Sequence, residues 1–223
     1  MPVISFVSSK GGVGKTTSAV VLAGEFAAAG RKVVLIDADP NRPLEAWARL
    51  KGTPEKLQLM IDDSAETIID TIEEARANAD FVIVDLEGTA TDRIGFAIAR
   101  SDLVLIPLQS SVLDASEAAK SVKLVHQMRK VANREIPYRV FFTRVPPAIR
   151  ERTARDIDRQ FSDAAIPVLP ATLIDRAAYR ALFSLGGILH DLERSDVSGL
   201  ESAKENGREF AQAVINVLKG EGA

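Results

Sequence analysis

The chain has 223 residues, of which 46% are hydrophobic, and a formal net charge of −3. This length and composition favour one sizeable hydrophobic core, and the absence of cysteine excludes disulfides, thiolate metal sites and iron–sulfur clusters. Because no apolar run approaches the ~20 residues that span a bilayer, we expect a cytoplasmic protein. With a slightly negative net charge, any contact with nucleic acid would have to come from a local basic patch.

Near the N-terminus the sequence predicts a strand, a glycine-rich loop and a helix. The strand is expected over Val3 to Val7 and the helix over Ser18 to Ala29. Between them lies SKGGVGKTT, residues 9–17, whose three glycines allow a tight turn with N–H groups directed at a phosphate. The loop therefore predicts a nucleoside triphosphate site, with Lys15 at the β- and γ-phosphates and the Thr16 hydroxyl on Mg²⁺.

The loop departs from the common phosphate-loop pattern, because Ser9 stands where that pattern has glycine and Lys10 follows it. The run K-G-G-x-G-K-T-T resembles the signature of the ParA/MinD-type ATPases, the deviant Walker A class of P-loop NTPases. This resemblance implies ATP and Mg²⁺ as cofactors, a catalytic role for Lys15, and a Lys10 that reaches the partner's nucleotide across a dimer interface. The nucleotide-binding residues that it implies in the loop are Lys10, Gly11, Gly12, Val13, Gly14, Lys15, Thr16 and Thr17.

Two apolar runs that end in acids follow the loop. Val33 to Ile36 leads into Asp37 and Asp39, and Phe81 to Val84 leads into Asp85. Ligands in a parallel sheet bind at the carboxyl ends of the strands, where these acids stand. By the resemblance, Asp39 orients the attacking water, Asp37 supports the Mg²⁺ shell, and Asp85 is the Walker B acid that holds a water of that shell. The alternative for Asp37 and Asp39 is a helix cap or a turn.

The segment after Asp85 differs from the family pattern. Many relatives have Thr-Pro-Pro there, whereas this chain has Leu86-Glu87-Gly88-Thr89. Gly88 keeps flexibility where a γ-phosphate sensor should move. We interpret Glu87 as a solvated loop acid rather than as a second general base, because Asp39 already accounts for the family's chemistry.

The rest of the chain alternates strand and helix patterns. Further strands are expected over Leu103 to Ile106 and Val140 to Phe142, and the expected helices are Ser64 to Ala77, Asp114 to Ala132, Pro147 to Phe161 and Leu200 to Leu218. The alternation predicts a single α/β domain over residues 1–223, doubly wound, with a mostly parallel sheet and helices on both faces. Thr143 and Arg144 fall where relatives place an adenine-binding segment, with Thr143 in place of asparagine.

The resemblance extends along most of the chain and is strongest to small ParA-type partition proteins. Pro40 to Trp47 also resembles a plasmid-borne subgroup that includes the VirC1 proteins. The resemblance implies an ATP-dependent homodimer that binds nonspecific DNA at the nucleoid. It further implies a ParB-like or other cargo adaptor protein that stimulates slow ATP hydrolysis, so that plasmid or chromosomal DNA is partitioned.

Arginines supply the candidate DNA contacts. Arg152, Arg155 and Arg159 share one face of an expected helix, and Arg176 and Arg180 lie at helical spacing further on. Arginine suits phosphate because its planar guanidinium binds two oxygens at once. Acids interleaved with the first group leave an ordinary solvated face as the alternative.

Three other functions remain open at this stage. The same ATPase could position a protein cargo, such as a chemoreceptor cluster, because the partner selects the cargo. A MinD-like membrane cycle would need a basic amphipathic C-terminal helix, whereas the apolar stripe of Leu200 to Leu218 fits packing on the core better, which makes a membrane partner unlikely. A ligase resembling dethiobiotin synthetase would need a catalytic constellation beyond the nucleotide site, and the sequence offers none.

Overall fold

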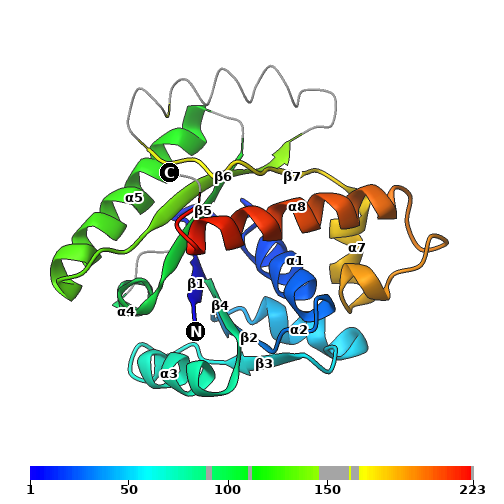
Figure 1. The fold of residues 1–223 in the computed structure, drawn as a ribbon, viewed down its shortest axis with the longest axis horizontal. Helices are drawn as coiled ribbons and strands as arrows, with labels where there is room; N and C mark the ends of the chain where they lie inside the picture. Colours follow the sequence, from blue (N-terminus) through cyan, green and yellow to red (C-terminus); the bar gives the residue numbers. More distant parts are fainter. Residues whose placement is uncertain (89–91, 110–111, 146–160, 162–165, 222–223) are drawn as a thin grey trace.

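A computed structural model describes residues 1–88, 92–109, 112–145, 161 and 166–221, with residues 112–117 described by their backbone alone (Figure 1). The described strands form one sheet in the order β3-β2-β4-β1-β5-β6-β7, and every pair in it is parallel. The strands are β1 (Val3–Phe6), β2 (Val33–Ala38), β3 (Leu57–Ile61), β4 (Phe81–Leu86), β5 (Leu103–Leu108), β6 (Tyr138–Val145) and β7 (Leu173–Ile174).

Helices cover both faces of the sheet (Figure 1). One face carries α1 (Lys15–Ala28), α2 (Pro43–Lys51), α7 (Ala177–Leu185), the 3₁₀ helix η2 (Leu189–Asp191) and α8 (Leu200–Leu218). The other face carries α3 (Ile68–Asn78), α4 (Asp92–Arg100) and α5 (Val112–Ala132). Because successive side chains of a strand point to opposite faces, neighbouring residues such as Leu35 and Ile36 enter different cores, and the central strands are therefore largely apolar.

This architecture confirms the predicted doubly wound α/β fold. The helix expected over Ser64 to Ala77 begins later, at Ile68, and the one expected over Ser18 to Ala29 begins earlier, at Lys15. The helix expected over Pro147 to Phe161 lies outside the described residues, except for Phe161 itself. The short elements that had not been predicted are α2, β3, α4, β7 and η2.

The apolar stripe of α8 packs into the core, as expected, with Phe210 and Val214 both 0% exposed. In the part of the chain that the structure describes, no helix combines the length and the apolar character needed to cross a membrane.

Helix α2 is tied to the segment that follows α7. Trp47 is 1% exposed, and its indole N–H donates to the carbonyl of Gly187 at 3.0 Å. Gly186, between α7 and Gly187, has φ 76°, and a Cβ there would stand 2.7 Å from the Cβ of Leu50. Glycine is therefore required for this close approach of α2 and α7.

Candidate nucleotide site

The predicted phosphate loop joins β1 to α1 at the carboxyl edge of the sheet. Gly12 and Gly14 have φ of 74° and 99°, in the left-handed region that glycine adopts without strain. Gly14 ends the loop, and its carbonyl accepts hydrogen bonds from the N–H of Ser18 at 2.9 Å and from the Ser18 hydroxyl at 2.7 Å. The N-terminus of α1 thus begins at Lys15, and its first N–H groups are available for an anion.

Lys15 lies at the centre of a group of acids. Its side chain is largely buried, and its ammonium donates to the carbonyl of Lys10 at 3.4 Å. Burial lowers the pKa of Lys15, and the negative charges of Asp85, Asp39 and Glu87 oppose that shift. The structure therefore brings together a lysine and three acids that come from the ends of β2 and β4. The side chain of Lys10 is half-buried.

The surroundings of Asp85 agree with its predicted Walker B role, and that role stays a prediction. It is 0% exposed, and among the described residues neither of its carboxylate oxygens has a hydrogen-bond partner. Burial raises the pKa of Asp85 to about 7, while the Thr16 hydroxyl and the charge of Lys15 oppose the rise. The hydroxyl thus lies near enough to act on the carboxylate without forming a hydrogen bond of ordinary geometry. A buried carboxylate without a donor beside a threonine hydroxyl suits a Mg²⁺ ion and its waters.

Asp37 makes contacts of a different kind. It pairs in register with Asp85 across β2 and β4, but one of its carboxylate oxygens accepts from the N–H groups of Leu44 at 2.9 Å and Glu45 at 3.0 Å. Burial raises the pKa of Asp37, and these N–H groups together with that of Asp39 oppose the shift. Asp37 therefore anchors the first turn of α2, which is the capping alternative. Its predicted place in the Mg²⁺ shell stays a prediction.

Asp39 forms a turn beyond the end of β2. It is half-exposed, and its Oδ1 accepts from the backbone N–H of Asn41 at 2.8 Å and from the Asn41 side-chain amide at 2.9 Å. The second carboxylate oxygen takes part in neither of these bonds. The position beside Lys15 agrees with the water-orienting role predicted for Asp39, and that role stays a prediction.

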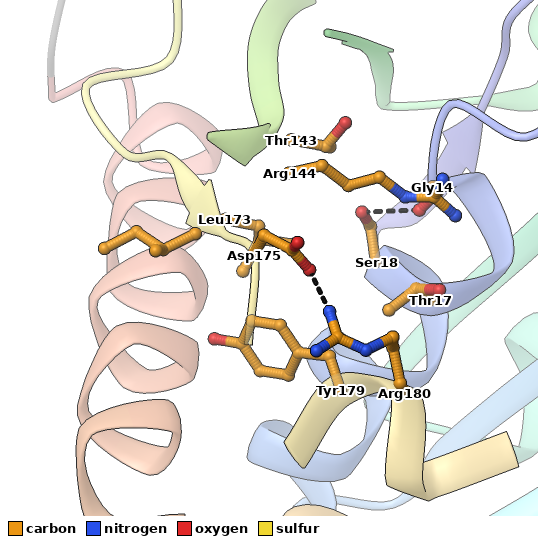
Figure 2. Close-up of a pocket in the computed structure, with 10 residues that line it drawn as sticks. Gly14, Thr17, Ser18, Thr143, Arg144, Leu173, Asp175, Tyr179 and Arg180 are labelled. Atoms are coloured by element: carbon orange, nitrogen blue, oxygen red, sulfur yellow. Dashed lines mark hydrogen bonds and ion pairs between the residues drawn. The ribbon is translucent and has the colours of Figure 1, made fainter. Parts of the chain in front are cut away.

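A pocket of about 220 Å³ opens beside the start of α1 (Figure 2). Its walls come from α1, β6, β7 and α7, and they include Gly14, Thr17, Ser18, Thr143, Arg144, Asp175, Tyr179 and Arg180. The backbone of Arg144 is left-handed, with φ 53°. This conformation costs free energy for a residue other than glycine, and such strained residues are concentrated at functional sites. The Tyr179 ring lines the pocket while its hydroxyl bonds to Ala203 and Asn206 of α8. A nucleoside next to the phosphate loop would enter this pocket.

Thr143 lines the pocket, and its hydroxyl contacts two backbone carbonyls. Its hydroxyl donates to the carbonyl of Val13 at 2.6 Å and lies 3.3 Å from the carbonyl of Leu108. The side chain is 2% exposed, so the hydroxyl ties β6 to the phosphate loop. The base contact that the sequence assigns to Thr143 stays a prediction.

The predicted DNA contacts separate into two groups. Arg152, Arg155 and Arg159 lie outside the described residues. Arg180 lines the nucleotide pocket, where its guanidinium forms an ion pair with Asp175 (Figure 2). Arg176 is half-buried at the N-cap of α7.

Sequence reasoning missed one buried ion pair beside the site. Arg93, in the first turn of α4, donates to Glu87 at 2.5 Å, and the side chains of the two residues are only 6% and 14% exposed. Arg93 also donates to the backbone carbonyl of Asp63, whose carboxylate binds Arg42 at 3.1 Å. Glu87 is therefore anchored next to Lys15, and the expectation that it is a solvated loop acid is wrong, because Arg93 pairs with it in a largely buried position. The only signal in the sequence was the departure from the family pattern at Leu86 to Thr89.

The geometry can be compared with known proteins. The family model described as VirC1 protein matches residues 1–219. The chain belongs to the VirC1 family. This VirC1-family chain is 39% identical over 218 residues to Protein ParA of Rhizobium radiobacter, covering 98% of each chain. It is 32% identical over 197 residues to Protein virC1 of Rhizobium rhizogenes, covering 85% of this chain and 83% of that protein.

A third relative is the Maintenance of carboxysome distribution protein A of Gloeobacter kilaueensis, 30% identical over 211 residues and covering 95% of this chain and 88% of that protein. Among solved structures, the MinC:MinD complex of Aquifex aeolicus contains a chain with a TM-score of 0.77 and 20% sequence identity. The match covers 97% of this chain and 96% of that chain. MinD of Pyrococcus horikoshii complexed with Mg-ADP has a TM-score of 0.71 and 16% sequence identity, and the match covers 99% of this chain and 98% of that chain. The VirC1-family chain therefore has the fold of ParA/MinD-type P-loop ATPases.

Proposed function

We propose that the chain acts as one ATPase domain over residues 1–223 that dimerises with ATP, binds DNA without sequence preference and partitions plasmid or chromosomal DNA. A ParB-like or other adaptor protein would stimulate its slow basal hydrolysis. The work would take place in the cytoplasm, on the nucleoid. The observation that carries the proposal is the convergence of Lys15, Asp39 and Asp85 behind a loop that has a second lysine, Lys10. The 39% identity to a ParA protein over 98% of both chains supports it.

The residues suggest a division of work in phosphoryl transfer. The N–H groups at the start of α1 and the Lys15 ammonium would hold the β- and γ-phosphates. Thr16 and Asp85 would hold Mg²⁺, which when bound neutralises developing charge on the phosphate oxygens. Asp39 would orient the attacking water through the carboxylate oxygen that does not accept from Asn41. Lys10 of one protomer would stabilise charge at the partner's phosphates, as an arginine finger does.

ATP is the nucleotide we propose. The pocket beside Gly14 offers an aromatic wall, Tyr179, and an aliphatic wall, Leu173, for a base. The Pyrococcus horikoshii relative of the same fold was solved with Mg-ADP, which supports an adenine nucleotide here.

A second candidate function keeps the same nucleotide cycle and changes the cargo. It is supported by the 30% identity over 211 residues to a protein named for the maintenance of carboxysome distribution. In this case the chain would position a protein assembly over the nucleoid, and an adaptor on that assembly would stimulate hydrolysis. Stimulation by an adaptor of a protein assembly, with none by a centromere-binding protein, would favour this second candidate.

The decisive experiment measures DNA binding by the purified chain with ATP, with ADP and without nucleotide. Unrelated duplexes should be used at two salt concentrations, with light scattering to follow dimerisation. We expect salt-sensitive, sequence-indifferent binding that requires ATP and accompanies the dimer. Absence of DNA binding in every state would refute the proposal and direct attention to the membrane-cycling or ligase alternatives.

A further inference from the structure

The solvent face of α5 carries a row of basic residues. Lys120, Lys123, Gln127 and Lys130 are all exposed, and their spacing of three, four and three residues keeps them on one side of the helix. The opposite side, with Val122 and Val125, is buried against the sheet and α4. We call the residues Lys120, Lys123, Gln127 and Lys130 the α5 basic face.

The charge on this part of α5 has one sign. The sequence from residue 118 to residue 134 contains no aspartate or glutamate, in a chain whose net charge is −3, and its cations are Lys120, Lys123, Arg129, Lys130 and Arg134. Two of these cations are directed to backbone carbonyls: Arg129 to Ile136 at 2.7 Å, and Arg134 to Ala99 at 3.0 Å. The positive charge that faces solvent therefore belongs chiefly to the lysines.

Acids near the face are already engaged. Glu135 forms an ion pair with Arg129 at 3.3 Å, and Glu73 lies 3.8 Å from Arg100 and 3.7 Å from Arg76. Asp114 and Glu117 precede the face, and their side chains lie outside the described part of the chain. Within the described part of the chain, no acid forms an ion pair with Lys123 or Lys130.

We propose that the α5 basic face is a contact surface for the phosphate backbone of duplex DNA, an inference that rests on the proposed function. Lys120 and Lys130 are ten residues apart, which places them about 15 Å apart along the helix axis. Duplex DNA presents one charge about every 1.7 Å along its axis, so a row of this length meets phosphates in any register. Lysine is a mobile point charge without fixed bonding geometry, which suits binding that does not depend on base sequence.

DNA fits this face better than a membrane does. A helix that lies on a lipid surface directs its apolar side to the lipid, whereas the apolar side of α5 is buried in the core. The face also approaches the nucleotide site, because Lys120 and Lys123 line a cavity of about 290 Å³ together with Ser9 and Gly88. A conformational change in the phosphate loop or in the segment after β4 would therefore alter the surroundings of Lys120 and Lys123. In an ATP-bound dimer, two such faces on one duplex would strengthen binding by avidity.

The test compares two double variants of the full chain. Lys123→Gln/Lys130→Gln removes two charges from the face, and Lys32→Gln/Lys56→Gln removes two exposed charges near β2 and β3, which lie at the far end of the sheet from α5. With ATP and unrelated duplexes, we expect the first variant to lose affinity about tenfold and to lower the slope of log K against log salt by about 2 per protomer. The control should keep the wild-type slope. Lys123→Arg/Lys130→Arg should bind as wild type does.

Each other result decides against the proposal. Equal weakening by both Gln variants would mean that net charge alone matters, and wild-type binding by Lys123→Gln/Lys130→Gln would refute the surface while leaving the proposed function intact. Loss of binding to anionic vesicles, with DNA binding unchanged, would assign the face to lipid instead. Wild-type protein that binds no duplex in any nucleotide state would refute both the surface and the proposed function. ATP hydrolysis and thermal unfolding of each variant, which should match wild type, verify that the fold is retained.

Discussion

The buried pair of Arg93 and Glu87 gives the sharpest prediction. Arg93→Met keeps most of the volume of the side chain but leaves the Glu87 carboxylate, which is 14% exposed, without its guanidinium partner. It also removes the donor to the carbonyl of Asp63. Breaking a buried ion pair from one side costs about 3 kcal/mol, because the remaining carboxylate loses its adjacent counter-charge in a medium of low dielectric constant. For a chain of this size that corresponds to a fall in Tm of about 6–12 °C.

Thermal and urea unfolding without nucleotide would measure this cost. Arg76→Met is the matched control, because Arg76 and Asp102 form a pair of similar length, 3.0 Å, whose side chains are 30% and 34% exposed. Asp102 also keeps the backbone N–H of Val3 at 2.8 Å as a partner. A solvent-accessible pair of this kind, about one-third exposed, contributes about 0–1 kcal/mol, so the control should lose little stability.

The double variant Arg93→Met/Glu87→Leu separates the lost pair from a general packing defect. The double variant removes the Glu87 carboxylate together with the guanidinium, so most of the stability should return. A loss below about 1 kcal/mol for Arg93→Met alone, or a double variant no more stable than that single variant, would refute the argument from burial.

Three further substitutions test the assignments at the site. Lys15→Gln should abolish nucleotide binding, measured by fluorescence of a labelled nucleotide, because it removes the buried cation at the phosphates; retained affinity would contradict the assignment. Asp39→Ala should bind ATP and dimerise but not turn over, and phosphate release at the wild-type rate would exclude Asp39 as the water-orienting residue. Asp37→Ala should cost about 1–2 kcal/mol in stability without nucleotide, because two N–H groups of α2 lose their acceptor. An altered Mg²⁺ dependence of nucleotide binding in Asp37→Ala would instead support the predicted place of Asp37 in the metal shell.

The sequence allowed a good prediction of the centre of the fold. Strands β2, β4 and β5 are buried on both faces, so each appears as an uninterrupted apolar run. Edge strand β3 was missed because it pairs only with β2 and has exposed residues, including Ile61 at 41%. Its pattern Leu-Gln-Leu-Met-Ile is therefore ambiguous without knowledge of its neighbour.

Part of the site could be predicted from the sequence, because the sheet topology determines where its acids lie. Asp39 follows β2 and Asp85 lies near the end of β4, and these two strands are neighbours in a parallel sheet, so the approach of both acids to Lys15 follows from the fold class. The Arg93 pair could not be predicted, because it depends on how the segment after β4 turns back onto α4. Likewise, the position of Arg180 at the nucleotide pocket depends on β7, a strand of two residues that has no sequence pattern of its own.

The contact between α2 and α7 has a practical consequence. Trp47 is the only tryptophan of the chain, and its indole is buried and bonded to Gly187. Helix α2 begins at the carboxylate of Asp37, and α7 carries Tyr179 and Arg180 in the pocket wall. The intrinsic fluorescence of this single indole therefore reports, without any label, whether the two helices stay docked while nucleotide fills and leaves the pocket. A shift of its emission on adding ATP would indicate that the packing of these two helices changes when the proposed nucleotide binds.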